Sequence, residues 1–238
     1  MAVIKVASYN IRRAIGIDGK KDLKQVQQVL NEIDADVLAL QEVEMVPGVV
    51  GVSRQAHALA GLLKMNYAFG PVHRLKFGSV GNAILSKYPI VKDIKHILPD
   101  PRDERGCLQT EIDAGGIHFS IFNMHLGLNQ VSRYRHLKYI ILPIMQASSI
   151  PTILAGDMNA TPAMREMRML SEYLHDTFQH NSGLHGNTYP SDAPRVRIDY
   201  IFTDDKSRCS SFRIIKSEAS DHLPVTATIK IPAVPPGL

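Results

Sequence analysis

The sequence predicts a mixed α/β fold in a single domain. Short apolar runs alternate with segments whose apolar residues recur at helical spacing. The glycines of residues 114–116 separate two such runs, which is typical of a β-hairpin. The length of 238 residues is one that α/β folds often reach undivided. These observations indicate mixed sheets with helices outside, over residues 1–231, followed by a loose tail at residues 232–238.

The first half of the chain predicts strands and helices in alternation. Its strands are short apolar runs, expected at residues 3–11, 36–41, 67–70, 82–86 and 90–97. Leu23, Val26, Leu30 and Ile33 recur at helical spacing after Asp22, a residue suited to begin a helix. A second amphipathic helix is expected over residues 53–64.

The second half begins with a predicted hairpin and closes with strands. Apolar runs predict strands at residues 106–112, 117–124, 152–155, 197–202, 211–215 and 225–231. Helical spacing predicts two helices, at residues 132–147 and 164–170. The sequence contains no internal repeat and no linker.

Composition and charge exclude few functions. The net charge is +4, which is compatible with an anionic substrate but does not establish nucleic-acid binding. Cys107 and Cys209 lie far apart and form no metal-binding or redox spacing. Neither a signal-peptide pattern nor an apolar run of membrane-spanning length is present. We therefore expect a cytoplasmic monomer with no integral membrane contact.

Polar side chains recur where the apolar strands end. Any one of them is more often a turn-forming or solvated residue, but all occupy the same kind of position, at which α/β folds place ligands. They are Asn10, Glu42, His125, Asp157, Asn159, Asp199, Asp221 and His222.

The four carboxylates among these residues predict a metal site. Glu42, Asp157, Asp199 and Asp221 would repel one another in one cleft unless a cation or paired histidines neutralised them. Oxygen ligands without thiolates favour Mg²⁺ or Mn²⁺. A hard cation beside a carboxylate base and an imidazole suits the hydrolysis of a phosphate ester.

An ordered set of motifs resembles the endonuclease/exonuclease/phosphatase superfamily. The resemblance runs nearly end to end and implies a DNase-like four-layer α/β sandwich, two packed mixed β-sheets flanked by helices. The matching segments are SYNI (8–11), LALQEV (38–43), GNAILSKYPI (81–90), ERGCLQTEI (104–112), FNMHLG (122–127), ILAGDMNATP (153–162), RIDYIF (197–202) and SDHLPV (220–225).

The resemblance implies a role for Asn10 and for each acidic residue of the site. Asn10 and Glu42 would hold the metal ion, with Asp221 on the same ion or its waters. Asp157 would orient or deprotonate the attacking water. Asp199 would pair with His222 and raise the pKa of its imidazole.

The remaining residues would bind the substrate phosphate. Asn159 would donate a hydrogen bond to a phosphoryl oxygen, and His222 would stabilise the developing negative charge. His125 would bind the phosphate or assist the leaving group. Arg105 would add a second positive charge, and its alternative is an exposed arginine at a strand end.

His125 narrows the branch of the superfamily that the chain resembles. Abasic-site endonucleases usually carry a tyrosine at the position of His125. The histidine here resembles the one found in DNase-type nucleases, tyrosyl-DNA phosphodiesterases, sphingomyelinases and inositol-polyphosphate phosphatases. DNase-type enzymes support this histidine with a second carboxylate. Residues 67–80 offer none, since their charge is limited to His73, Arg74 and Lys76.

Loop composition bears on the substrate. Irregular stretches are expected at residues 44–52, 72–80, 98–104 and 175–195, none long enough to wedge into a duplex. The stretches carry basic residues that either track a phosphate backbone or only solubilise the loops: His73, Arg74, Lys76, Arg102, Arg195 and Arg197. No base-stacking platform and no exposed apolar hairpin is evident, and residues 44–52 form the only apolar loop.

The sequence thus predicts a Mg²⁺- or Mn²⁺-dependent phosphodiesterase, with a nuclease as the leading hypothesis. The alternative is an enzyme acting on a lipid headgroup or on an inositol or sugar phosphate. A third hypothesis is a catalytically inactive scaffold that binds a partner, which would lack at least one central residue. Every central position is filled.

Overall fold

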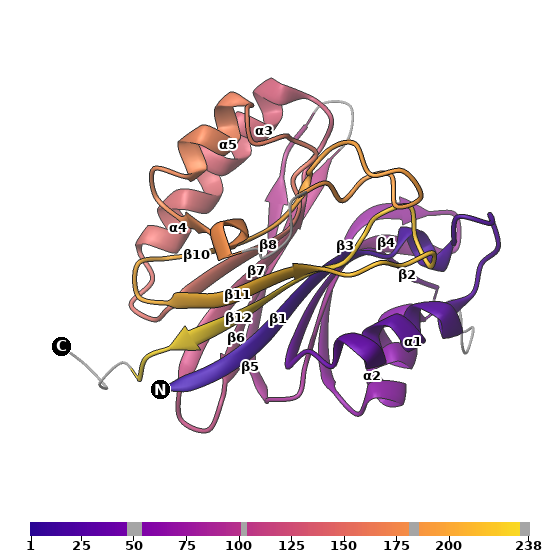
Figure 1. Cartoon of the computed structure of the whole chain (residues 1–238), viewed down its shortest axis with the longest axis horizontal. Helices are drawn as coiled ribbons and strands as arrows, with labels where there is room; N and C mark the ends of the chain where they lie inside the picture. Colours follow the sequence, from indigo (N-terminus) through magenta and orange to yellow (C-terminus); the bar gives the residue numbers. More distant parts are fainter. Residues whose placement is uncertain (47–53, 101–103, 181–185, 234–238) are drawn as a thin grey trace.

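Two six-stranded sheets form the centre of the protein in a computed structural model that describes residues 1–46, 54–100, 104–180 and 186–233 (Figure 1). The first sheet has the order β11-β12-β1-β2-β4-β3. Its strands are β1 (Ala2–Asn10), β2 (Val37–Met45), β3 (Asn66–Leu75), β4 (Gly78–Ser86), β11 (Arg208–Ile214) and β12 (Val225–Ile231).

The second sheet has the order β5-β6-β7-β8-β10-β9. Within each sheet one central pair is parallel, β1 with β2 and β7 with β8, and the other pairs are antiparallel. The strands are β5 (Ile90–Leu98), β6 (Arg105–Asp113), β7 (His118–His125), β8 (Thr152–Asp157), β9 (His175–Asp176) and β10 (Asp199–Thr203).

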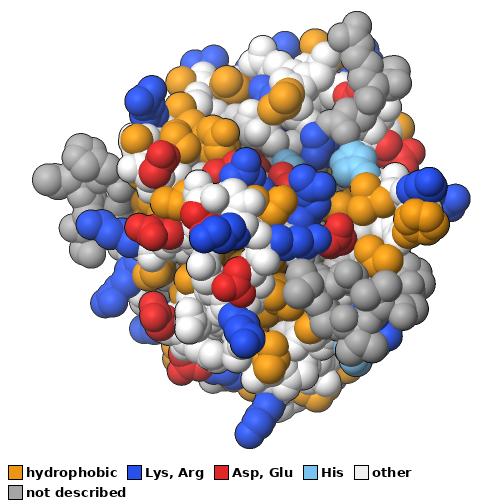
Figure 2. Space-filling model, turned by 90° about the vertical axis from the view of Figure 1, so that its right-hand side faces the viewer, with side chains coloured by type: hydrophobic (Ala, Val, Ile, Leu, Met, Phe, Trp, Pro, Cys, Tyr) orange, Lys and Arg blue, Asp and Glu red, His pale blue; other side chains and the backbone are white. Residues whose placement is uncertain are grey.

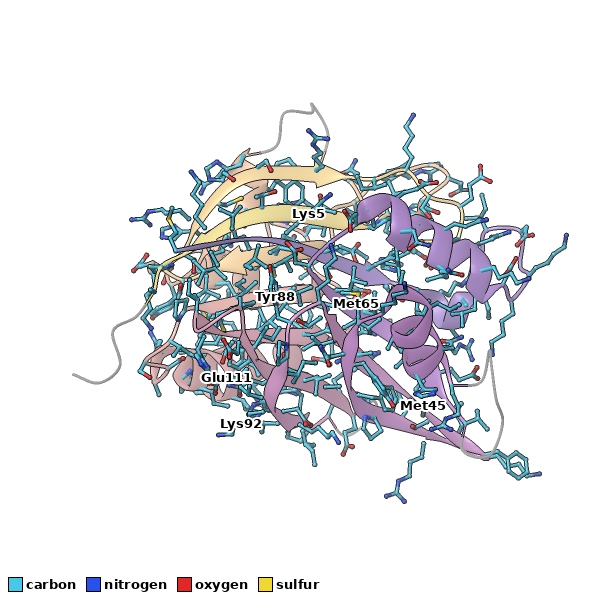
Figure 3. All side chains as sticks on the ribbon, turned by 90° about the horizontal axis from the view of Figure 1, so that it is seen from below. Lys5, Met45, Met65, Tyr88, Lys92 and Glu111 are labelled. Atoms are coloured by element: carbon cyan, nitrogen blue, oxygen red, sulfur yellow. The ribbon has the colours of Figure 1, made fainter. Side chains whose placement is uncertain are left out.

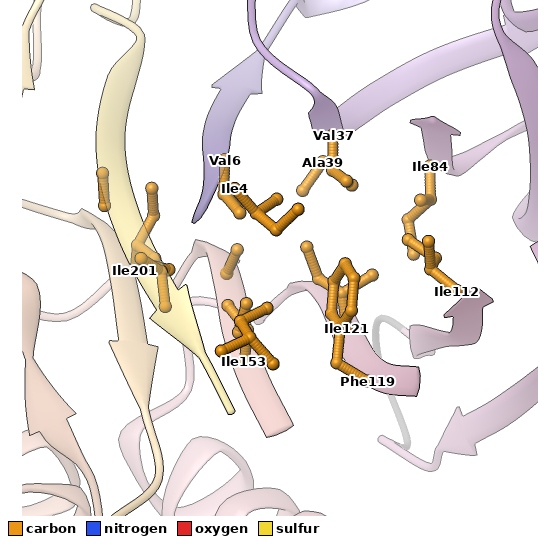
Figure 4. Packing of buried hydrophobic residues seen from close by; sticks show 14 of the residues in the cluster. Ile4, Val6, Val37, Ala39, Ile84, Ile112, Phe119, Ile121, Ile153 and Ile201 are labelled. Carbon is orange, nitrogen blue, oxygen red and sulfur yellow. The ribbon is translucent and has the colours of Figure 1, made fainter. Parts of the chain in front are cut away.

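Alternating apolar residues of the two sheets make the inner core. Ile4 and Val37 of the first sheet face Phe119 and Ile153 of the second, and all four are fully buried (Figure 4). The strand period of two places these side chains on one face and turns their neighbours outward. The sheets therefore pack face to face, as the predicted sandwich requires.

Helices cover both outer faces. α1 (Leu23–Ile33) and α2 (Gln55–Leu63) pack on the first sheet and form a second buried cluster with it (Figure 3). Asp22 caps α1, as expected, by accepting a hydrogen bond from the Lys24 backbone N–H at 2.8 Å. The outer face of the second sheet is covered by the remaining helices, α3 (Gln130–His136), η2 (Leu137–Ile141), α4 (Leu142–Gln146) and α5 (Arg165–Leu170).

These layers confirm the predicted four-layer α/β sandwich. The helix predicted over residues 132–147 is present, but η2 is a π-helical turn within it. Pro143 explains the irregularity, because it has no backbone N–H to donate to the preceding turn. Two short helical turns, η1 (Arg12–Ala14) and η3 (Thr177–His180), and the two-residue strand β9 were not predicted.

The predicted loop at residues 72–80 is wrong. β3 and β4 continue through it to a tight turn at Lys76 and Phe77, and they leave Phe77 70% exposed. The polar residues His73, Arg74 and Lys76 hid this hairpin, because they interrupt the apolar pattern that predicts strands. The chain therefore has an exposed hairpin with an apolar tip, contrary to the expectation from its sequence.

Candidate active site

Polar residues from both sheets meet at one end of the sandwich. His125 ends β7 opposite Asp157, which ends β8, and Asp199 begins the antiparallel β10 opposite the same Asp157. A pocket of about 550 Å³ opens here. Most of the predicted site residues line it, namely Glu42, Arg105, His125, Asp157, Asn159, Asp221 and His222. Asn10 and Asp199 lie behind them, 1% and 0% exposed.

Glu42 reaches the pocket through a bulge in β2. Leu40 pairs with Ala83 and Val43 with Gly81, so that Gln41 and Glu42 together lie opposite one residue of β4. Glu42 has a φ of 52°, a value that non-glycine residues seldom adopt. Bulges are often found beside active sites, where they redirect a side chain. Here the bulge buries Gln41 between the sheets and places Glu42 at the pocket.

Asn10 links the two carboxylates nearest to it. Its Nδ2 donates to Asp157 Oδ2 at 3.1 Å and to Glu42 Oε1 at 3.3 Å. Its Oδ1 accepts the backbone N–H of Arg12 at 3.0 Å. In this arrangement Asn10 holds the carboxylates together, and its direct ligation of a metal would require the amide to turn over.

Asp157 lies at the centre of the cluster. Its Oδ1 accepts the backbone N–H of Asn159 at 2.9 Å, and its Oδ2 is 3.5 Å from His125 Nε2 and 3.6 Å from His222 Nε2. The carboxylate is thus held by an amide and flanked by two imidazoles. A buried carboxylate so placed is suited to orient or deprotonate a water molecule.

His222 and Asp199 form a buried pair. His222 Nδ1 is 3.0 Å from Asp199 Oδ2, which also accepts a hydrogen bond from the Thr188 hydroxyl at 2.5 Å. Burial lowers the pKa of His222, but the charge of Asp199 and its hydrogen bond, with Asp157 and Asp221 nearby, outweigh burial and raise the pKa to about 10. His222 is therefore an imidazolium whose Nε2 faces the pocket.

His125 differs from His222 in charge. Burial lowers its pKa and Arg105 lowers it further, although Asp157 acts in the opposite direction. Its Nε2 accepts from Asn159 Nδ2 at 3.1 Å, and Arg105 Nη1 is 3.5 Å from both ring nitrogens. One neutral and one charged histidine thus flank Asp157, a separation that commonly marks different roles in proton transfer and charge stabilisation.

The donor atoms of the site fit a hard divalent cation. The described residues give Glu42 no ion-pair partner, although it shares the Asn10 amide with Asp157. The donor atoms of Asp157, Asp199 and His222 also lie within 4.8 Å of one another. His222 is protonated between the two carboxylates and has no free lone pair, so this geometry favours a cation beside Glu42.

Asp221 lies at the edge of the cluster. Its Oδ2 is 3.3 Å from Arg12 Nε, and its side chain is 26% exposed. The Ser220 hydroxyl donates to the Asn10 carbonyl at 2.7 Å and ties the Asp221–His222 loop to the end of β1. The structure thus brings all nine predicted site residues together, while their individual roles stay predictions.

A buried amide network behind the site was missed. Asn123 Nδ2 donates to the Leu40 carbonyl at 2.9 Å and to the Ala83 carbonyl at 2.8 Å, while its Oδ1 accepts from Gln41 Nε2 at 2.7 Å. Asn123 therefore joins the second sheet to β2 at its bulge. A polar residue within an otherwise apolar strand was the signal that could have identified it.

Two residues that line the pocket were also missed. Arg13 belongs to η1, and the Tyr189 ring is centred 4.8 Å from the His222 ring. Their positions depend on irregular backbone, which leaves no periodic signal in the sequence. Figure 2 shows basic, acidic and histidine side chains close together on the face toward which β1 and β2 run.

The basic loop residues suggested as phosphate contacts differ in their position relative to the pocket. His73 lines the pocket, and Arg195 is exposed. Arg197 is unavailable, because it is 8% exposed, forms an ion pair with Asp176 and lies over the Phe178 ring. Arg102 lies outside the described residues.

The His222–Asp199 pair predicts a pH dependence of stability. The pKa of an unfolded histidine is about 6.5, and the folded value is raised, so the pair stabilises the protein fully below about pH 6.5 and less as pH rises toward 10. We expect the free energy of unfolding to fall over this window by a few kcal/mol, measured by urea denaturation with chelator present. His222→Gln should flatten this fall, and an equal slope in both proteins would contradict the assignment.

Comparisons with known proteins bear on the family and the fold. A sequence model described as the Endonuclease/Exonuclease/phosphatase family matches residues 7–222. The uncharacterized protein YbhP of Escherichia coli K12 is 25% identical over 95% of this chain and 96% of its own length.

Solved structures share the fold. An endonuclease/exonuclease/phosphatase from Beutenbergia cavernae has a TM-score of 0.80 at 22% identity, covering 97% of this chain and 72% of that one. A mannosyl-6-phosphatase from Bacteroides thetaiotaomicron has a TM-score of 0.77 at 21% identity, covering 96% and 100%. The family match covers most of the chain, and the chain therefore belongs to the endonuclease/exonuclease/phosphatase family, whose members are phosphoric ester hydrolases.

Proposed function

We propose that this protein is a divalent-metal-dependent phosphodiesterase that cleaves nucleic acid. The observation that carries the proposal is the arrangement around Asp157, where a buried carboxylate lies between one neutral and one charged imidazole, beside Glu42. This arrangement combines a base with cationic groups for a phosphate, the two requirements of phosphate ester hydrolysis.

Glu42 would hold a Mg²⁺ or Mn²⁺ ion, with Asn10 and Asp221 on the ion or its waters. When bound, such an ion neutralises the negative charge of the phosphoryl oxygens. These residues offer oxygen donors and no thiolate, and such donors favour Mg²⁺ or Mn²⁺.

Side chains of the site would activate the water molecule and bind the phosphate. Asp157 orients a water molecule toward phosphorus and accepts its proton. The Nε2–H of His222 donates to a phosphoryl oxygen, and Asp199 keeps this imidazole charged and correctly oriented. Asn159 and Arg105 bind the other phosphoryl oxygens, and His125 lies beside the position of the leaving group.

A second candidate substrate is a phosphate ester with a compact or apolar leaving group. Part of the pocket wall is apolar, formed by Val72, Leu75, Val80, Leu128 and Ile198. The adjoining β3–β4 hairpin exposes Phe77. Such a wall suits a lipid headgroup ester or a sugar phosphate. The described chain has no helix of the length and hydrophobicity needed to cross a membrane.

Turnover of a substrate panel at several salt concentrations tests the proposal. The panel contains an aryl phosphodiester, plasmid DNA, an abasic duplex, single-stranded RNA, sphingomyelin and inositol phosphates, each with Mg²⁺ or Mn²⁺. A nuclease that contacts several backbone phosphates should lose apparent affinity steeply with salt, with a logarithmic slope of about −0.7 to −0.9 per phosphate.

Three other results of the substrate panel would change or refute the proposal. Turnover of sphingomyelin or inositol phosphates with a shallow salt dependence would replace the nuclease by the second candidate. Cleavage of the abasic duplex alone would show that His125 does not mark the branch. No turnover of any ester with either metal would refute the proposal.

A further inference from the structure

Arg13 follows β1 in a segment of unusual backbone conformation. Arg12, Arg13 and Ala14 have φ values of 46°, 55° and 62°, so three successive non-glycine residues are left-handed. Such conformations are costly and persist only where the surrounding structure fixes them. Backbone strain of this kind is concentrated at sites where it positions a functional group.

Hydrogen bonds hold this turn on three sides. Gln55, which is 0% exposed, donates from Nε2 to the Arg13 carbonyl at 2.7 Å and accepts the Glu44 N–H at 2.8 Å. The Arg12 N–H donates to Asn10 Oδ1, and the Asp22 N–H donates to the Ala14 carbonyl at 2.8 Å. The turn is therefore fixed to β1, to β2 and to the start of α1.

The two arginines of the turn differ in their partners. Arg12 forms an ion pair with Asp221. Arg13 lines the pocket and is exposed, and its guanidinium makes no ion pair with any described residue. An exposed guanidinium on a fixed backbone turn that neutralises no carboxylate of the described residues is available to an anionic group of the substrate.

Arg13 and Arg105 reach the pocket from different sheets. Arg105 begins β6 of the second sheet and lies beside His125, whereas Arg13 follows β1 of the first sheet. His222 beside Asp157 and Arg105 beside His125 already supply two cationic groups there. A further guanidinium on the other wall suits a second anionic group rather than the scissile phosphate.

Resting on the proposed function, we propose that Arg13 binds a second phosphate of the substrate, one adjacent to the phosphate that is cleaved. The substrate class is then an ester with at least two neighbouring phosphates. Either the next backbone phosphate of a nucleic acid or the second phosphate of a sugar bisphosphate supplies this chemistry. Arg13 is thereby a specificity-determining residue.

Direct binding tests this assignment without requiring turnover. Isothermal titration in Mg²⁺ would give Kd values for thymidine 3′,5′-bisphosphate against thymidine 5′-monophosphate, and for a hexose bisphosphate against its monophosphate. The wild-type protein should bind a bisphosphate at least about 10-fold more tightly than its monophosphate, the scale of a charge-assisted hydrogen bond. A preference in the thymidine pair alone would indicate a nucleotide substrate, and one in the hexose pair alone a sugar phosphate.

Arg13→Ala should reduce this preference to about 2-fold or less, and Arg13→Lys should restore part of it. Arg135→Ala is the matched control, because Arg135 is exposed on α3 and does not line the pocket. An unchanged preference in Arg13→Ala, or no preference in the wild-type protein with either pair, would overturn the assignment.

Parallel turnover of the aryl phosphodiester separates the two proposals. If the wild-type protein binds bisphosphates preferentially but hydrolyses no ester, the proposed function fails and the Arg13 contact stands. If Arg13→Ala keeps the kcat of the aryl diester and loses only the bisphosphate preference, both proposals are supported. Equal loss of affinity for the monophosphate and the bisphosphate would place Arg13 at the scissile phosphate and refute its proposed role.

Discussion

Asp157→Asn is expected to lower kcat by at least about 100-fold, the scale on which a general base contributes. The substitution keeps the shape of the side chain and its hydrogen bond from the Asn159 N–H, but it removes the charge and the proton acceptor. The measurement is steady-state turnover of an aryl phosphodiester with saturating Mg²⁺ or Mn²⁺.

A matched control removes an equivalent charge elsewhere. Asp93→Asn alters an exposed carboxylate on β5 that does not line the pocket, and it should leave kcat unchanged. Thermal unfolding of both variants shows whether either is misfolded. A folded Asp157→Asn protein with wild-type kcat would remove Asp157 from the reaction.

His222→Ala is expected to lower kcat by a similar factor, about 100-fold or more, because it removes the imidazolium at the pocket. Among the described residues it also leaves the buried Asp199 carboxylate with the Thr188 hydroxyl as its one side-chain partner, which should destabilise the fold. The double variant His222→Gln, Asp199→Asn removes both charges. It should regain stability without regaining activity.

Asp199→Asn tests whether Asp199 acts on activity by keeping His222 charged. Without this carboxylate the pKa of His222 should fall, so the basic limb of the pH–activity profile should move to lower pH than in the wild-type protein. A merely structural role for Asp199 would lower activity equally at every pH. An unshifted basic limb would therefore contradict the positioning role.

The sequence was sufficient to predict residues at the ends of regular strands. Asp157 and His125 could be placed together because parallel neighbouring strands end at the same edge of a sheet. Asp199 and Asp221 follow the same logic, because each comes at or near the start of a strand that runs antiparallel to one ending there. Apolar runs and strand period suffice for this level of inference.

The irregular features of the backbone could not be predicted from the sequence. The left-handed run at Arg12–Ala14 contains no glycine or asparagine to mark it. The bulge at Glu42 arises from pairing with β4, a partner that lies distant in the sequence. The outer part of the β3–β4 hairpin shows no strand pattern in the sequence, because its residues there are basic. Each of these features depends on contacts that periodicity cannot express.

Metal dependence tests the central claim most directly. The wild-type protein should be stripped with a chelator and assayed on an aryl phosphodiester before and after Mg²⁺ or Mn²⁺ is restored. We predict turnover at background after stripping and full recovery with either ion, because Glu42 and Asp157 would otherwise face a phosphate without a cation between them. Undiminished turnover in the stripped protein would contradict the account.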